Sequence, residues 1–367
     1  MIRVALLGAG AMGRVHADAY RSIPGVAVTA VGGHDHAATR ALAASLDARA
    51  YMSVEALLDE AECDVVDCCL PTGLHRAAVE GAAARGRHVV CEKPIALTLE
   101  DARAAIAAAE RAGVHLLVGQ VVRFFPAYRR LAAALGEGQV GAPALCTLLR
   151  QGFYPRGQDD WYRDDERSGG IFVDLMIHDC DWALRQFGPA ERVYARLVRR
   201  AGRDRRAGRD GHDGHDGRDG HDGHDGHDGH DDDGRPFAQA TATVRHRGGV
   251  ITGLTATWGH PGPFTTAVEV AGTGGLLRLS TDDARPVRLL TDVPNGADSK
   301  AGVALPSLDG GEDPYRTQLA HFMDVVAERA APLVRPEEAL AALELALAAR
   351  ASARTGRPRY LDREDVR

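Results

Sequence analysis

The sequence predicts two domains of different class: an α/β domain with a doubly wound parallel sheet, then an α+β domain with a large, mostly antiparallel open sheet. The first observation is length, because 367 residues are many for one hydrophobic core. The second is that short apolar runs alternate with alanine-rich helical segments in residues 1–122, as strands and crossover helices do. The third is that several later segments alternate apolar with polar residues, which is typical of antiparallel strands with one covered face.

Composition excludes several classes of partner and location. The net charge of −7 comes mostly from residues 202–234, which contain eleven Asp and only five Arg. The remaining chain is nearly neutral, so we expect no nucleic-acid and no anionic-membrane partner. The six cysteines form no CxxC pair, which indicates reduced thiols without a zinc or haem site. No apolar run reaches the about 20 residues of a membrane span, and a buried strand at the start leaves no room for a signal peptide. We therefore expect a cytoplasmic protein.

A glycine-rich loop follows the first apolar run. Residues 2–7 have the character of a strand buried on both faces, and Gly8, Gly10 and Gly13 complete the pattern GxGxxG before a helix at residues 15–23. Here Gly8 permits the tight turn, Gly10 lets the backbone approach a pyrophosphate, and Gly13 lets the helix pack closely on the strand. The loop predicts a dinucleotide-binding Rossmann domain, with a purely structural loop as the alternative.

The second strand is expected at residues 26–31, and the residues at its end should bind the adenosine ribose of the cofactor. Gly33 holds the position at which an acidic residue would accept hydrogen bonds from the ribose hydroxyls of NAD. His34 beside it and Arg40 further on slightly favour the phosphate of NADP, whereas Asp35 can reach the ribose if the turn is long. The sequence leaves NAD or NADP open, with a slight preference for NADP.

Two further strand ends should lie beside the cofactor, because ligands bind beyond the carboxyl ends of the strands in a doubly wound sheet. The strand at residues 65–70 ends in residues 71–75, where His75 fits either a contact with the nicotinamide half of the cofactor or the first turn of a helix. A strand at residues 88–91 then ends in the sequence Glu-Lys-Pro at 92–94.

Lys93 is unusual in this chain, because only Lys93 and Lys300 are lysines among 44 basic residues. A compact ammonium at a strand end can donate to a substrate hydroxyl or share its proton, which Arg cannot do. We therefore predict a catalytic role for Lys93. The alternative is a surface salt bridge with Glu92.

A paired-glycine turn at 169–170 precedes Asp174 and His178, which lie four residues apart. At this spacing two side chains share one face of an α-helix. An aspartate that orients an imidazole, with the imidazole free to take a proton from a hydroxyl, suits general base catalysis near neutral pH. The alternative reading is a surface pair or an N-terminal cap.

Several motifs together resemble the glucose-fructose oxidoreductase, inositol dehydrogenase and rhizopine-catabolism (Gfo/Idh/MocA) family. The specific ones are GAGAMG at 8–13, CEKP at 91–94 and SGGIFVDLMIHDCD at 168–181. Supporting matches are QVVRFFPAY at 120–128, FGPAERVYA at 187–195, DPYRTQLAHF at 313–322 and SARTGRP at 352–358. The resemblance implies that Lys93, Asp174 and His178 are the catalytic set and that the Lys93–Pro94 bond is cis. It also implies a homodimer or homotetramer.

The resemblance further implies an NAD(P)-dependent oxidoreductase that moves a hydride between the cofactor and a carbinol or carbonyl of a sugar, cyclitol or related polyol. Two alternatives of the same fold stay open, an NAD-dependent glycosidase and a nucleotide-binding regulator without catalysis. The expected cofactor-binding residues are Gly8, Gly10, Ala11, Met12, Gly13, Gly33, His34, Pro71, Thr72, His75, Glu92, Lys93, Pro94 and Gln120. By position alone, the candidate substrate residues are Arg123, Tyr154, Trp161 and Tyr315.

The second domain should span residues 123–335, with residues 336–367 returning toward the first domain, which spans 1–122. Its expected strands are residues 144–151, 192–198, 239–245, 250–258, 266–272 and 276–280, and the closing helices are residues 315–329 and 336–355. One face of this sheet should pack on the helix of Asp174. The other is the expected interface between copies of the chain, since an open sheet of this size seldom faces water.

Residues 202–234 contain repeated Gly-His-Asp triplets and no apolar residue from 208 to 234. Such a segment cannot offset the entropy of ordering, so we expect a disordered loop. Its six histidines, interleaved with aspartates, can also hold Zn or Ni loosely, but repeat expansion within a hairpin connection explains it more simply, and we predict no metal site. Deletion of residues 208–233 should leave turnover intact, and a clear loss of activity would contradict this expectation.

Overall fold

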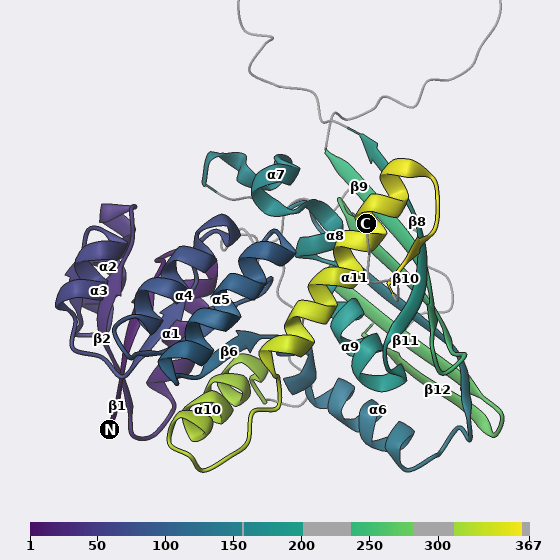
Figure 1. Cartoon of the computed structure of the whole chain (residues 1–367), viewed down its shortest axis with the longest axis horizontal. Coiled ribbons are helices and arrows are strands. Elements are labelled where there is room, and N and C mark those ends of the chain that lie inside the picture. Colours follow the sequence, from purple (N-terminus) through teal and green to yellow (C-terminus); the bar gives the residue numbers. More distant parts are fainter. Residues whose placement is uncertain (156–157, 201–235, 282–311, 362–367) are drawn as a thin grey trace, which may run out of the picture.

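The computed structural model describes residues 1–155, 158–200, 236–281 and 312–361. The Gly-His-Asp repeat and its expected loop therefore lie outside the described residues. The described chain forms two sheets that lie side by side, with helix α11 (Pro336–Thr355) between them (Figure 1). The predicted fold class is confirmed: a parallel α/β domain precedes a domain with a larger, mostly antiparallel sheet.

The first sheet has six parallel strands in the order β3-β2-β1-β4-β5-β6. Its strands are β1 (Ile2–Leu7), β2 (Val26–Gly32), β3 (Arg49–Tyr51), β4 (Val65–Cys68), β5 (His88–Glu92) and β6 (Leu116–Gly119). Its helices are α1 (Ala11–Arg21), α2 (His36–Ser45), α3 (Val54–Glu60), α4 (His75–Ala83) and α5 (Leu99–Ala112). The order reverses beside β1, which places the ligand crevice at the carboxyl ends of β1 and β4.

Helix α1 begins at Ala11, four residues before the predicted start at residue 15. Gly10 is its N-cap, so the glycine loop runs directly into the helix. The backbone N–H groups of the first turn therefore face the crevice at the end of β1, which is the arrangement that binds a phosphate.

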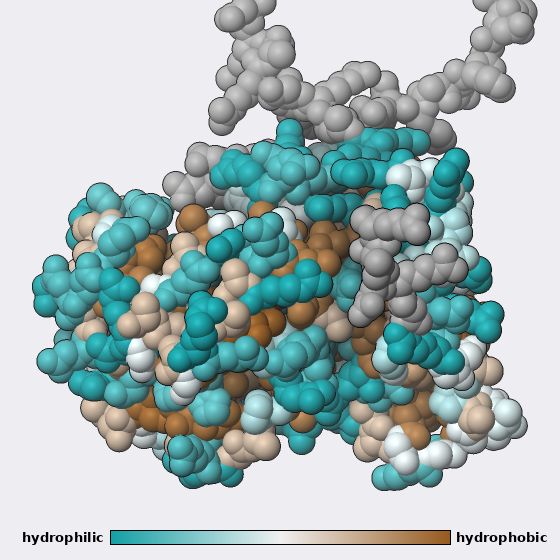
Figure 2. Space-filling model, in the orientation of Figure 1, coloured by the Kyte–Doolittle hydropathy of each residue, from teal (hydrophilic) through white to brown (hydrophobic). Residues whose placement is uncertain are grey.

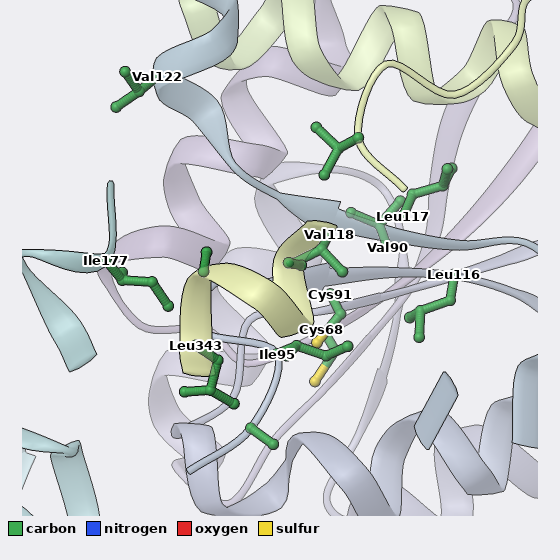
Figure 3. Close-up of a cluster of buried hydrophobic side chains, with 14 of the residues drawn as sticks. Cys68, Val90, Cys91, Ile95, Leu116, Leu117, Val118, Val122, Ile177 and Leu343 are labelled. Carbon is green, nitrogen blue, oxygen red and sulfur yellow. The ribbon is translucent and has the colours of Figure 1, made fainter. Parts of the chain in front are cut away.

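The core of this domain joins the strands to elements from the other half of the chain. Figure 3 shows buried side chains of β4, β5 and β6 in one cluster with Ile177 of α9 (Ile177–Phe187) and Leu343 of α11. Both Ile177 and Leu343 are fully buried. The two domains are therefore packed against each other through apolar side chains, and the ends of the strands hold a fixed position relative to α9.

The second sheet has seven described strands in the order β12-β11-β7-β10-β9-β8-β13. All neighbours are antiparallel except β7 and β10. The strands are β7 (Pro143–Gly152), β8 (Ala190–Arg200), β9 (Phe237–His246), β10 (Ile251–Trp258), β11 (Thr265–Gly272), β12 (Gly275–Ser280) and β13 (Arg359–Tyr360). Helices α8 (Gly170–Asp174), α9 and α11 contact this sheet, and α6 (Pro126–Gly136) lies at its β12 edge.

The two faces of the second sheet differ in burial. Along β9, alternate residues are buried, as the sequence pattern predicts for a strand with one covered face. The uncovered face presents large apolar side chains, including Leu145, Ile251 and Leu276, each at least 44% exposed. Figure 2 shows one face of the molecule, on which hydrophilic residues predominate and hydrophobic residues form patches among them.

The remaining helices close the structure around these sheets. They are η1 (Thr72–Leu74), η2 (Val121–Phe124), η3 (Gln158–Arg163), α7 (Asp165–Ser168) and α10 (Pro314–Val326). Helix α10 packs on α1 and η2, and α11 contacts α5 and β6 of the first domain as well as α9 and β8 of the second. Among the described residues, none of the helices has the length and apolar character required to cross a membrane.

Candidate active site

One cavity of about 800 Å³ connects the glycine loop with the three predicted catalytic residues. Its first-domain walls include Gly8, Gly10, Ala11, Met12, Gly33, His34, Pro71, Thr72, Glu92 and Lys93. Its second-domain walls include Arg150, Phe153, Trp161, Tyr162, Asp174, His178, Trp258, Phe264 and Tyr315. A ligand that reaches from the loop to His178 therefore meets both domains.

The glycine loop fits a pyrophosphate for steric reasons. Gly8 has φ +103°, and a Cβ there would lie 2.5 Å from the carbonyl oxygen of Cys69. A Cβ at Gly13 would lie 1.9 Å from the carbonyl oxygen of Gly8. In contrast, a Cβ at Gly10 meets nothing within 4 Å. Packing therefore requires glycine at residues 8 and 13. Gly10 instead keeps space open at the start of α1, where a phosphate would approach the backbone.

The end of β2 forms the wall of the cavity at which an adenosine ribose would lie. Gly33, His34, Asp35 and Thr39 line it. Asp35 is the N-cap of α2, and its Oδ1 accepts from the Ala38 N–H at 3.0 Å. Thr39 is fully buried in this wall, and its hydroxyl has no hydrogen-bond partner among the described residues. Asp35 therefore keeps its position at the ribose end while it also caps the helix.

The chain after β4 contributes Pro71 and Thr72 to the cavity, but not His75. The His75 ring is buried in α4, with Nδ1 2.9 Å from the Pro94 carbonyl oxygen and Nε2 2.8 Å from the Leu70 carbonyl oxygen. The structure thus places His75 behind the cavity wall, where it connects the two loops that carry Pro71 and Lys93. This favours the helix interpretation of His75 over the cofactor contact. Pro94 also lies outside the lining, behind Lys93.

Lys93 reaches across the domain boundary to α8. Its Nζ donates to the carbonyl oxygen of Asp174 at 2.8 Å and to Oδ1 of Asp174 at 3.1 Å. The Lys93–Pro94 peptide bond is cis, as the resemblance implied. Glu92 contacts Lys93 through the backbone, because its Oε2 accepts from the Lys93 N–H at 3.0 Å. The ammonium is therefore paired with Asp174, and the alternative of a surface salt bridge with Glu92 does not describe this site.

Asp174 and His178 do not share a face of a single helix, so that part of the expectation is wrong. Asp174 is the last residue of α8, and α9 begins at Ile177. The Asp174 carboxylate contacts Lys93. The buried Nδ1 of His178 has no hydrogen-bond partner among the described residues. Both residues line the same cavity. However, residues 175–176 separate the two helices, and the Asp174 carboxylate contacts Lys93.

The surroundings of His178 keep its ring neutral. Burial, the Lys93 ammonium and the Arg150 guanidinium all lower the pKa of His178 well below its ordinary value. Arg150 is itself buried on the inner face of β7, where Nη2 donates to Asp179 at 2.7 Å and to the Tyr128 hydroxyl at 3.2 Å. The ring is therefore in the unprotonated form that a general base needs, although both cations oppose the charge that it gains on taking a proton.

The structure divides the lower-ranked candidates into two groups. Trp161 and Tyr315 line the cavity, whereas Gln120, Arg123 and Tyr154 do not. The Gln120 amide is buried without a hydrogen-bond partner among the described residues. Tyr154 packs its ring against Trp258, with ring centroids 5.4 Å apart. Neither residue is placed for direct contact with a ligand in this cavity.

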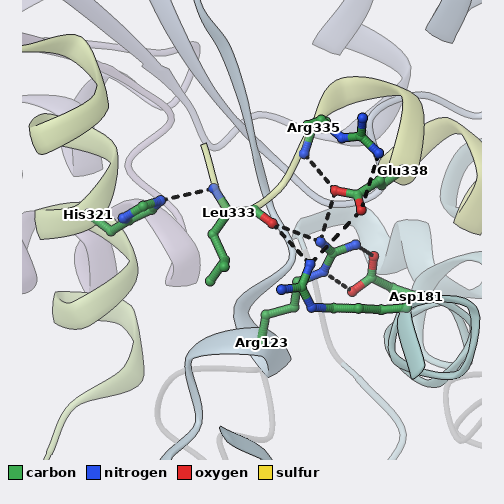
Figure 4. Close-up of polar contacts among 7 residues, drawn as sticks. Arg123, Asp181, His321, Leu333, Arg335 and Glu338 are labelled. Carbon is green, nitrogen blue, oxygen red and sulfur yellow. Dashed lines mark hydrogen bonds and ion pairs between the residues drawn. The ribbon is translucent and has the colours of Figure 1, made fainter. Parts of the chain in front are cut away.

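Arg123 belongs to a buried ion-pair network instead. Its guanidinium donates to both carboxylate oxygens of Asp181, at 2.8 and 2.5 Å, and to Glu338 at 3.1 Å (Figure 4). It also donates to the carbonyl oxygen of Leu333 at 2.9 Å. The network joins η2 to α9 and α11, so Arg123 fixes the position of elements around the site and does not face a substrate.

Several cavity residues were not among the sequence-based candidates, and Arg150 and Tyr162 lie nearest in contact or charge to the predicted catalytic residues. Burial, then Asp174 and Glu92, raise the pKa of Tyr162, so its hydroxyl stays protonated. A signal for Arg150 was present, because an arginine occupies an inward position of an alternating strand, between Leu148 and Gly152. A charge at such a position needs a partner or a ligand. Tyr162 follows Trp161 in η3 and had no comparable signal.

Comparison with known proteins agrees with this arrangement. Residues 2–120 match the family described as "Oxidoreductase family, NAD-binding Rossmann fold", and residues 128–278 match the "GFO/IDH/MocA C-terminal domain". D-apiose dehydrogenase of Paraburkholderia graminis is 37% identical over 193 residues, 52% of this chain and 51% of that protein. Inositol 2-dehydrogenase of Rhizobium meliloti is 34% identical over 182 residues, 50% of this chain and 54% of that protein. These alignments span about half the length of the relatives concerned.

The likeness also extends over the whole chain at lower identity. The scyllo-inositol 2-dehydrogenase (NAD(+)) of Bacillus subtilis is 26% identical over 364 residues, 98% of this chain and 96% of that protein. A solved structure of GenD2 from gentamicin A biosynthesis in complex with NAD matches with a TM-score of 0.77 at 24% identity, over 99% of this chain and 97% of that one. At such identity the structural match shows the fold. The two family matches together cover most of the chain, which therefore belongs to the Gfo/Idh/MocA family of oxidoreductases with an NAD-binding Rossmann fold.

Proposed function

We propose that the protein is a nicotinamide-dependent dehydrogenase or reductase that acts on a carbinol or carbonyl of a sugar, cyclitol or related polyol. The single observation that carries this proposal is the continuous cavity from the glycine loop to Lys93, Asp174 and His178. A cofactor held at one end of this cavity would present its reactive end to the catalytic residues at the other. The related proteins named above, which include apiose and inositol dehydrogenases, support the class of substrate.

The proposed reaction divides the work among three side chains. His178 takes the proton of the substrate hydroxyl through Nε2, because its Nδ1 is enclosed. Lys93 donates from Nζ to the same oxygen. Asp174 holds the Lys93 ammonium through two contacts and so fixes its direction. When bound, the nicotinamide ring supplies the hydride acceptor or donor.

The cofactor would lie along the first-domain wall. The start of α1 would hold its pyrophosphate at the space left open by Gly10, and Asp35, Thr39 and His34 would surround the adenosine ribose. Pro71, Thr72 and Glu92 would flank the part of the cofactor that approaches Lys93. The slight preference for NADP stays a prediction, because Asp35 lies in the cavity and is a candidate reader of an NAD ribose.

The two alternatives differ from this proposal in what happens to free cofactor. A glycosidase of this fold would retain its NAD through turnover, and a regulator would bind nucleotide without changing it. The test mixes purified protein with NAD or NADP and a panel of sugars and cyclitols, and records absorbance at the reduced-nicotinamide band. Net reduction of free cofactor with one of the polyols supports the proposal. Cofactor binding without any reduction across the panel contradicts it.

We further propose that copies of the chain associate through the uncovered face of the second sheet into a homodimer or homotetramer. The exposed Leu145, Ile251 and Leu276 side chains on β7, β10 and β12 support this, because such apolar groups on one face of a large sheet are characteristic of an interface. Sedimentation velocity tests the proposal, and a monomer at micromolar concentration would contradict it.

A further inference from the structure

A buried charged cluster lies behind the cavity wall at the end of β5. The His16 ring of α1 is fully buried, with Nδ1 2.8 Å from Oδ2 of Asp67 and Nε2 3.1 Å from Oε1 of Glu92. Asp67 in β4 is also fully buried, and Glu92 is 5% exposed and lines the cavity. The proposed proton transfer uses none of these three residues, although Glu92 directly precedes the catalytic lysine.

The hydrogen bonds define the charge of this cluster. Both ring nitrogens of His16 face a carboxylate oxygen, so each has to donate a proton, which only the imidazolium can do. Burial is the largest single influence and opposes this charge, but Asp67 and Cys69 together outweigh it and raise the pKa of His16 well above its ordinary value. Two carboxylates and one imidazolium leave one net negative charge. If the extra proton sits on a carboxylate instead, the net charge of the cluster is the same.

The neighbouring groups do not cancel this charge. Burial, then the nearby carboxylates, raise the pKa of the Cys69 thiol and of the Tyr20 and Tyr315 hydroxyls, so all three stay neutral. In the cavity, the Lys93 ammonium is already paired with Asp174. Since Glu92 is the member of the cluster that reaches the cavity, the uncompensated charge lies at the cavity wall beside Lys93.

We propose that the Asp67–His16–Glu92 cluster makes this protein favour the oxidised cofactor over the reduced one, an inference that rests on the proposed function. The nicotinamide ring carries a positive charge when oxidised and is neutral when reduced. Beyond the carboxyl end of β5, the ring would lie against the wall that Glu92 forms. A negative charge held in a buried, poorly screened position attracts the cationic ring and has no such effect on the neutral one.

His16 acts in this proposal as a positioning residue. It keeps the Glu92 carboxylate in place from one side, while the Lys93 N–H holds it from the other. Its positive charge also reduces the net charge of the two buried carboxylates from −2 to −1, which lowers the free-energy cost of burying them together. The charge at the wall therefore belongs to Glu92, and a variant at this position is the direct test.

The test compares the dissociation constants of oxidised and reduced cofactor for the purified full-length protein, by calorimetry and by nicotinamide fluorescence. Glu92→Gln should raise the ratio of the dissociation constant for the oxidised form to that for the reduced form about tenfold, which corresponds to about 1.4 kcal/mol. Glu92→Asp keeps the charge and should leave the ratio within about twofold of wild type. Asp35→Asn removes a carboxylate from the adenosine end, which both forms share, and should change both constants equally.

Each result has a defined meaning. An unchanged ratio in folded Glu92→Gln overturns the inference, as does an equal change in the ratio for Asp35→Asn. If circular dichroism shows that Glu92→Gln does not fold, Glu92→Ala is measured instead, because it places no donor against the Lys93 N–H, and the same tenfold change is expected. Wild-type protein that binds neither form overturns the proposed function itself, and this inference with it.

Discussion

The sharpest test of the catalytic assignment replaces Lys93 by Arg and His178 by Asn, singly and together. Arg keeps the positive charge at residue 93, but its planar guanidinium cannot release a proton and is larger than the ammonium that contacts Asp174. Asn keeps a polar group of similar size at residue 178 and removes the base. Neither residue lies at the adenosine end of the cavity, so cofactor affinity should stay nearly unchanged.

The expected magnitude follows from the contacts that are lost. A hydrogen bond to a charged group contributes about 1.5–3 kcal/mol, and Lys93 makes two to Asp174 in a position only 16% exposed. A lost general acid or base lowers the rate by about 10² to 10⁴. We therefore expect kcat of either single variant to fall by about 10² or more. Since both groups serve one proton transfer, the double variant should lose far less than the product of the two single effects.

The assay is steady-state reduction of cofactor with the polyol that the substrate panel identifies, together with a separate measurement of cofactor affinity. Arg76→Gln is the matched control, because Arg76 is a cation on the exposed side of α4 that pairs with Glu80 and Asp101. This control should leave kcat unchanged. Turnover of Lys93→Arg near the wild-type rate would refute the reasoning and leave Lys93 as a structural partner of Asp174.

Three further outcomes are expected. Because the pKa of His178 lies well below 6.5, its neutral form persists as pH falls, so log kcat/KM should stay flat through pH 6.5 and decline only below it. Lys93→Met removes one of the cations that lower this pKa and should shift the decline to higher pH; an unshifted profile would exclude His178 as the base. Gly33→Asp places a carboxylate where a Cβ lies 3.0 Å from the Thr39 hydroxyl, and it should change the discrimination toward NAD by about 1–3 kcal/mol; strong wild-type preference for NAD would instead identify Asp35 as the ribose reader. Gly13→Ala should destabilise the protein by more than about 1 kcal/mol in thermal unfolding, because its Cβ would lie 1.9 Å from a backbone oxygen; a melting temperature equal to that of wild type would contradict the packing role of Gly13.

The fold was largely predictable because each element carries its own local pattern. The predicted helix at residues 336–355 coincides with α11, and the predicted strands of the second sheet agree with the structure to within two residues at each end. Short elements with weak patterns were not predicted. An example is β13, a two-residue strand that forms only because the edge of β8 is there to pair with it.

The candidate site was less predictable, because side-chain partners depend on tertiary distance. The motifs identified Lys93, Asp174 and His178, and the structure brings all three to one cavity. The partner of Asp174 could not be read from a spacing of four residues, because the paired glycines begin a one-turn helix that ends at Asp174. Arg123 was predicted to contact the substrate only because of its position in a motif. The structure shows that its guanidinium forms ion pairs with Asp181 and Glu338 instead.

The arrangement of α11 has a consequence for how the chain is completed during synthesis. This helix is synthesised long after α5 and β6, yet it covers both of these elements. Its Leu343 belongs to the same apolar cluster as Val90 and Leu117. A nascent N-terminal domain therefore keeps an uncovered apolar surface until α11 has been made, and it depends on this helix to acquire its final stability.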